Sequence, residues 1–178
     1  MARKSRPAAP PDGIAAEHID RRGGMHHHAS VLSLLVLGAI VAWGASGYAG
    51  SRVERRSVAA DAVALVVSAP SLVRNGEVYE ATFEVTARRR IGKLVFAVSP
   101  GLWRETTTNS MLPQPGEQRF EEGMFRFVFE PLEAGQSFTF KADLQINPSL
   151  FGDNEGEVVV LDGKQRLASL ALRIRVLP

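Results

Sequence analysis

The chain has 178 residues, 21 basic and 19 acidic side chains and no cysteine, which excludes a disulfide framework. Residues 1–28 carry five basic and three acidic side chains, and the remainder carries 16 of each sign. Because nucleic-acid binding depends on a concentrated basic surface, this balance argues against a nucleic-acid partner. The length predicts one folded domain in addition to an N-terminal extension.

Residues 1–28 combine proline, glycine, alanine and charge with few large apolar side chains, so we expect a disordered tail. The consecutive residues His26, His27 and His28 cannot converge on one ion as spaced ligands do. We therefore interpret them as part of the solvated tail and not as a metal site. Met25 is an alternative translation start.

The twenty residues 29–48 carry no Lys, Arg, Asp or Glu. A helix of that length spans about 30 Å, the thickness of the hydrocarbon core of a bilayer. We predict a transmembrane helix over residues 29–50 that serves as an uncleaved signal anchor, with Trp43 and Tyr48 at the membrane interface. A cleaved signal peptide is the alternative, because the strongest apolar stretch covers only the 13 residues 31–43 and small residues follow it.

Basic residues are more numerous before this segment than directly after it, which favours a cytoplasmic tail. The predicted location is therefore the bacterial inner (cytoplasmic) membrane, crossed once, with the C-terminal domain outside the cytoplasm. A polar linker is expected over residues 51–60, and the domain over residues 61–178. The lipid bilayer is the partner expected for residues 29–50.

From residue 61 onward the apolar residues recur with period two, which is typical of β-strands. The clearest strand is 78–87, where Tyr79, Phe83 and Val85 alternate with polar residues. Further strands are predicted at 62–69, 93–99, 124–130, 137–147, 157–161 and 166–177. We expect the aromatic residues Phe125, Phe127, Phe129, Phe138 and Phe140 to lie in the core.

Turn signals separate these strands, among them the dipeptide Asp162-Gly163 of a tight hairpin. Residues 100–122 lack the pattern, so we predict an irregular crossing there with room for one short strand. No helix is expected after residue 52. The predicted fold is all-β, an immunoglobulin-like antiparallel β-sandwich of about seven to eight strands.

Four segments carry a family resemblance: the alternation over 79–85, the strand 94–100 entering SPG, the stretch LEAGQSFTF at 132–140, and the final RIRVLP. Together they resemble bacterial membrane-anchored immunoglobulin-like or fibronectin type III-like modules over residues 61–178. The chain departs from antibody-type domains because it has no cysteine pair and because Trp103 follows the third strand. The resemblance implies an adhesion, scaffold or accessory role.

The long segment 101–122 is the candidate surface for binding a partner. It holds Trp103, Arg104, Met111 and Leu112 among polar residues, and Trp and Arg often dominate the energy of interfaces. The alternative is that Trp103, Met111 and Leu112 fill the open end of the core.

A second candidate is the polar loop 148–155, in which Asp153, Asn154 and Glu155 offer oxygen ligands for Ca²⁺. The spacing of these residues differs from that of an EF-hand. An ordinary polar loop between strands is the simpler interpretation.

Every histidine lies at or before His28, so the domain offers no Ser-His catalytic pair. We predict no enzymatic activity and no cofactor. The expected function is that of an accessory subunit of a membrane complex, whose domain binds another envelope protein. The alternatives are a carbohydrate- or Ca²⁺-binding envelope module and an enzyme of unfamiliar type, which would need a deep pocket lined by ionisable groups with shifted pKa values.

Overall fold

The computed structural model describes residues 24–47, 50 and 52–178, with side chains from residue 31 onward. The chain divides into two compact units, Met1–Ala49 and Gly50–Pro178. The first 23 residues of the predicted tail lie outside the described residues. Residues 24–28 are helical and not disordered, because they extend the helix that the apolar run forms.

Helix α2 (Gly24–Ala45) therefore begins and ends earlier than the predicted segment 29–50. It ends where Gly47 adopts a φ of 66°, a left-handed conformation that glycine reaches without strain. Within the part of the chain that the structure describes, no helix is both long and apolar enough to cross a membrane, so the span predicted over residues 29–50 is not found.

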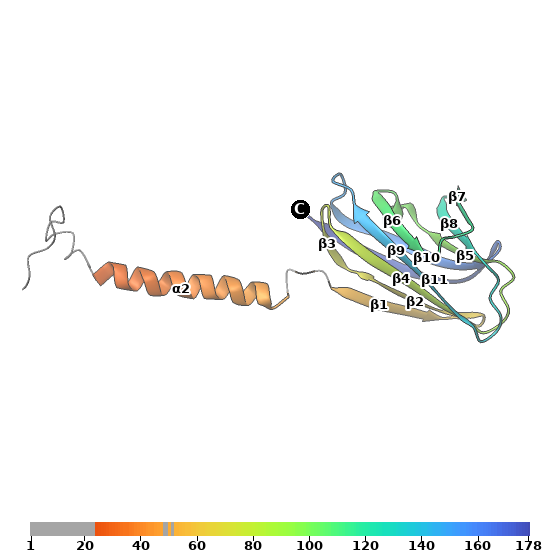
Figure 1. Cartoon of the computed structure of the whole chain (residues 1–178), viewed down its shortest axis with the longest axis horizontal. Helices are drawn as coiled ribbons and strands as arrows, with labels where there is room; N and C mark the ends of the chain where they lie inside the picture. Colours follow the sequence, from red (N-terminus) through yellow and green to blue (C-terminus); the bar gives the residue numbers. More distant parts are fainter. Residues whose placement is uncertain (1–23, 48–49, 51) are drawn as a thin grey trace, which may run out of the picture. The chain divides into compact units, whose positions relative to one another are not determined.

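The second unit consists of two β-sheets packed face to face (Figure 1). The five-stranded sheet has the order β1-β2-β4-β9-β6, formed by β1 (Val53–Ala59), β2 (Val63–Pro70), β4 (Val78–Ala87), β9 (Ser137–Ile146) and β6 (Thr106–Leu112). The six-stranded sheet has the order β3-β11-β10-β5-β8-β7, formed by β3 (Leu72–Arg74), β11 (Gln165–Leu177), β10 (Gly152–Asp162), β5 (Leu94–Val98), β8 (Met124–Phe129) and β7 (Glu117–Glu121). The predicted all-β sandwich is confirmed.

The core lies between the two sheets and is rich in phenylalanine. The ring centroids of Phe83 and Phe96, which come from opposite sheets, are 6.0 Å apart. Phe127, Phe129 and Phe140 are buried, and Phe125 and Phe138 are half-buried against them. This arrangement confirms the predicted aromatic core.

All seven clearly predicted strands are present, but the described residues contain eleven strands. Strands β1 and β3 were not expected, and the segment 100–122 holds two strands, β6 and β7, where room for one short strand was expected. Strand β1 replaces the predicted linker 51–60 and pairs antiparallel with β2. Strands β6 and β7 replace most of the predicted irregular crossing. All four lie at sheet edges, where both faces of a strand can meet water and the alternating apolar pattern is lost.

A one-turn helix, α3 (Pro100–Trp103), also contradicts the expectation of no helix after residue 52. Pro100 is compatible with the first turn, because that position needs no backbone N–H. Helix α3 joins β5 of the six-stranded sheet to β6 of the five-stranded sheet.

Candidate functional site

Helix α3 is held against strand β10 by close backbone packing. The backbone N–H of Ser99 donates to the carbonyl of Glu157 at 3.0 Å, and the Ser99 hydroxyl accepts from the N–H of Glu157 at 2.9 Å. A Cβ atom added to Gly101 would lie 2.2 Å from the carbonyl oxygen of Glu155, so only glycine permits this approach. The contacts fix the position of the residues that follow Gly101.

The side chain of Trp103 points from α3 into the molecule. It is 7% exposed, and its ring centroid lies 4.9 Å from that of Phe127. The Thr106 hydroxyl donates to the Trp103 carbonyl at 2.8 Å, which satisfies an acceptor at the helix end. Trp103 is thereby held at the boundary between the aromatic core and the surface.

A groove of about 380 Å³ opens beside Trp103, between the start of β6 in one sheet and strands β7 and β8 in the other. We call it the β6–β7 groove. Its volume lies at the lower end of the range of about 300–1,000 Å³ that is typical of ligand pockets. The lining residues are Trp103, Arg104, Thr106, Gln118, Arg119, Phe120, Phe125, Arg126 and Phe127.

The β6–β7 groove combines aromatic surface with unused hydrogen-bond donors. Phe120 is 56% exposed, and its ring centroid lies 5.0 Å from that of Phe125. Among the described residues, the indole N–H of Trp103 has no acceptor and the exposed guanidinium of Arg104 has no ion-pair partner. Trp103 and Arg104, which carry these two donors, both line the groove beside its apolar surface.

The structure separates the four residues predicted to bind a partner. Trp103 and Met111 are buried in the core, as the core-filling alternative expected of them, whereas Leu112 is 68% exposed and fills nothing. Trp103 and Arg104 line the β6–β7 groove, but Met111 and Leu112 do not. A role of these residues in binding stays a prediction.

Sequence reasoning missed Phe120, Arg119 and Arg126 as residues of the groove. The short strand β7 brings Phe120 there, and its sequence EQRFE lacks the apolar alternation of a half-buried strand. The isolated phenylalanine among four polar residues was the one available signal.

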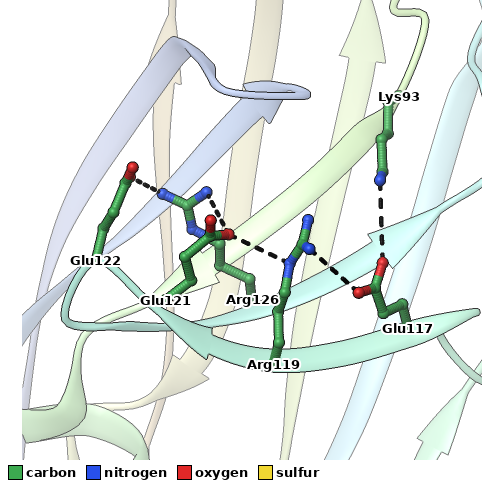
Figure 2. Close-up of polar contacts among 6 residues, drawn as sticks. All are labelled: Lys93, Glu117, Arg119, Glu121, Glu122 and Arg126. Carbon is green, nitrogen blue, oxygen red and sulfur yellow. Dashed lines mark hydrogen bonds and ion pairs between the residues drawn. The ribbon is translucent and has the colours of Figure 1, made fainter.

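Charged side chains on β7 and its neighbours form a continuous series, which we call the charge ladder (Figure 2). Arg119 pairs with Glu117 at 3.2 Å and with Glu121 at 3.3 Å. Glu117 also lies 3.9 Å from the ammonium group of Lys93, which precedes β5. The ladder thus alternates in sign along the edge strand and ties it to β5 and β8.

Arg126 is the buried member of the charge ladder, with only 4% of its side chain exposed. It pairs with Glu121 at 3.3 Å and with Glu122, and its Nε atom has no hydrogen-bond partner. The residue across from it on β5 is Ala97, which belongs to a small second apolar cluster. Burial of the guanidinium makes its two carboxylate partners important for stability.

The predicted loop 148–155 is shorter than expected, because β10 begins at Gly152 and includes Asp153, Asn154 and Glu155. Pairing with β11 places Arg173 within 2.6 Å of Asp153 and 3.4 Å of Glu155. The hydrogen bond from Arg173 lowers the pKa of Asp153, and the charge of Arg175 adds to this. Cations would have to compete with both arginines for these carboxylates.

The segment also lacks the surroundings of a metal site. The residues that the structure describes contain no group of three or more His, Cys, Asp or Glu side chains that could hold a metal ion. The amide of Asn154 donates to the carbonyl of Gly152 at 3.2 Å. The Ca²⁺ interpretation of this segment therefore gains no support.

Comparison with known proteins gives similarity to solved structures only. No protein-family profile matches the chain. No curated protein sequence is significantly similar to it. A CARDB domain from Pyrococcus furiosus, determined in complex with di-metal ions, has a TM-score of 0.41 and 11% identity, covering 68% of this chain and 95% of that one.

Two further structures are similar at the same low level. A CaDoc0917–CaCohA2 complex has a TM-score of 0.38 and 12% identity over 60% of this chain and 94% of that one. The C. elegans protein WR4, an MSP family member, has a TM-score of 0.32 and 8% identity over 62% of this chain and 97% of that one. Similarities this low carry no information about function.

Proposed function

We propose that this chain is a non-enzymatic interaction module, whose immunoglobulin-like sandwich binds another protein of the cell envelope as an accessory subunit of a membrane complex. The observation that carries the proposal is the β6–β7 groove, with exposed Phe120 beside Trp103 and Arg104. Trp and Arg in pockets of this kind are the residues that most often dominate the energy of protein interfaces. The unused donors add directional contacts for a partner.

The shifted pKa values in the domain support a binding role over a catalytic one. Burial raises the pKa of Tyr79 to about 12, and a hydrogen bond from Arg56 lowers the pKa of Glu54. Efficient general acids and bases have pKa values near the working pH, and both of these shifts move away from neutrality. Ion pairing and burial account for them without a catalytic role.

Attachment to the membrane is part of the proposal and rests on the sequence. The uncharged run 29–48 precedes the domain, and basic residues are more numerous before it than directly after it. In this arrangement the N-terminal segment holds the sandwich at the outer surface of the cytoplasmic membrane, where the β6–β7 groove meets its partner.

Co-purification tests the proposal. The full chain is recovered from envelope extracts as wild type, as Phe120→Ala, and as the control Phe151→Ala. Phe151 is 57% exposed, against 56% for Phe120, and it does not line the β6–β7 groove. We expect a specific partner with the wild type and the control, and a loss of about fivefold to thirtyfold with Phe120→Ala, as for a residue worth about 1–2 kcal/mol. Equal recovery with both variants would exclude the groove as the interface.

A further inference from the structure

We propose that the partner binds as an extended segment that adds a strand to the free edge of β6 and places an apolar side chain in the β6–β7 groove and a carboxylate against Arg104. This inference rests on the proposed function and specifies its chemistry. Strand addition supplies affinity through backbone hydrogen bonds and specificity through alternate side chains.

The edge strands of the two sheets differ in charge. Strand β1 carries Glu54, Arg55 and Arg56, and β3 has only three residues. By contrast, β6 has seven residues, and its sequence TTTNSML contains no charged side chain. Charged side chains, short length and bulges are the usual devices that keep a sheet edge from pairing. Strand β6 has a bulge but lacks the other two devices, so the residues on either side of the bulge remain open to pairing.

Strand β7 borders the same groove but is a poor acceptor of a strand. Its outward-facing residues Glu117, Arg119 and Glu121 are engaged in the charge ladder (Figure 2). A second copy of β7 paired antiparallel about Arg119 would place Glu117 opposite Glu121 and the two arginines opposite each other. Like charges directly opposite destabilise a pair of strands, so the ladder disfavours dimerisation through β7.

The opposite side of the sandwich is more closed. There the Arg56 guanidinium of β1 donates to the carbonyl of Ala171 in β11 at 3.5 Å, so a side chain bridges the two sheets. The β6–β7 side instead has the groove of about 380 Å³ between its edge strands. A strand added to β6 would lie along the opening of that groove.

The geometry of β6 limits where the strand can add. The register with β9 shifts between Thr108 and Ser110, so a regular ladder can continue only on either side of this bulge. The part that borders the groove begins at Thr106. Because so short a ladder supplies few hydrogen bonds, most of the affinity has to come from the side chain that enters the groove.

Strand alternation then predicts the sequence of the partner. Successive side chains of a strand point to opposite faces, so residues on the same face are two apart. An apolar side chain that enters the groove meets Phe120 and Phe125. Trp103 and Arg104 line the same groove and carry the donors without a partner, and we place the residue two positions away against them. Those donors match a carboxylate, so the partner segment carries an apolar residue and an Asp or Glu separated by one residue.

Peptide selection tests this inference. A displayed library of random nine-residue peptides is selected on the full chain and, separately, on Arg104→Glu. We expect the wild type to enrich the apolar–x–acidic pattern, and the best peptide to bind Arg104→Glu about tenfold or more weakly, because a hydrogen bond to a charged group is lost. Lys164→Glu is the control, because Lys164 does not line the groove and has no ion-pair partner within the described domain. Absence of the pattern, or an equal loss with Lys164→Glu, would overturn the inference.

Amide hydrogen exchange on the full chain then tests strand addition. The selected peptide should slow exchange in residues 106–108 and leave β1 unchanged. If Phe120→Ala loses the co-purified partner but the amides of β6 stay unprotected, the groove remains the interface and strand addition is wrong. If Phe120→Ala retains the partner, the groove is excluded as the interface and this inference fails with it. If the wild type recovers no specific partner, the proposed function itself fails.

Discussion

Replacing Gly101 by alanine tests whether the packing of α3 against β10 is what places Trp103 beside the β6–β7 groove. The added Cβ atom would lie 2.2 Å from the carbonyl oxygen of Glu155. Carbon–oxygen contacts of this kind normally lie near 3.3 Å, so the helix and the strand have to separate by about 1 Å. The oxygen belongs to the backbone of β10, and no side-chain rotation relieves the clash.

The cost follows from overpacking. Forcing extra atoms into a well-packed site typically destabilises a protein by about 1–3 kcal/mol, and the rigid backbone neighbour places Gly101→Ala toward the upper end. With a urea m-value of about 2 kcal/mol/M for a domain of this size, a loss of about 2–3 kcal/mol lowers the unfolding midpoint by about 1–1.5 M. The displaced α3 also shifts Trp103 relative to Phe127.

Urea unfolding of the purified full chain, followed by circular dichroism, measures the free energy of unfolding. Trp43 is changed to Phe in a parallel sample so that Trp103, the remaining tryptophan, reports its own environment by fluorescence. Gly116→Ala is the matched control, because its Cβ would meet only the Val128 carbonyl oxygen at 3.9 Å. A midpoint and an emission spectrum unchanged by Gly101→Ala, or changed equally by the control, would show that the packing of α3 on β10 does not position Trp103.

Three further predictions concern the charged and buried groups of the domain. Arg126→Met should leave the free energy of unfolding unchanged or raise it. Glu121→Gln should lower it by about 1–2 kcal/mol, because it weakens one of the two ion pairs of a buried guanidinium and leaves the pair with Glu122. Urea unfolding of both variants decides, and the opposite order would contradict the prediction. Arg173→Gln should raise the pKa of Asp153 toward its ordinary value, because the hydrogen bond that stabilises the carboxylate is lost. An NMR titration of Asp153 that finds no change would disprove the pairing. The raised pKa of Tyr79, about 12 in the folded chain against 10 in the unfolded one, stabilises the fold below pH 10 and loses that effect as the pH rises toward 12. The stability of Tyr79→Phe should therefore fall less than that of the wild type over this interval, and parallel stability curves would contradict the prediction.

Whether a strand could be predicted from the sequence depended on whether one of its faces is buried. Strand β4 has the same bounds as its prediction, because one face is buried and the other meets water, which produces a clean alternation. Strands β1, β6 and β7 lie at edges and are mostly exposed on both faces, so their residues follow no such period. The described domain therefore has more strands than predicted, eleven in all, and the additional strands lie at the sheet edges. The strands that supply most of the core were all predicted.

The candidate site depended on tertiary contacts that local patterns do not encode. Tryptophan in a long polar segment is compatible with binding and with core filling. In the structure Gly101 packs closely against β10, and Trp103, two residues later, is buried against Phe127. Asp153 could be read as a loop ligand because its partner Arg173 is 20 residues away in the sequence. The register of β10 on β11 brings the two together.

Site-specific photo-crosslinking in intact cells measures most directly whether the β6–β7 groove binds a partner. A benzoylphenylalanine is introduced in place of Phe120 and, in a separate strain, in place of the equally exposed Phe151. We expect a discrete crosslinked species at position 120 that is absent at position 151. It should contain an envelope protein with an apolar–x–acidic segment at the crosslink. A position 120 that yields no adduct, or the same adducts as position 151, would contradict this expectation.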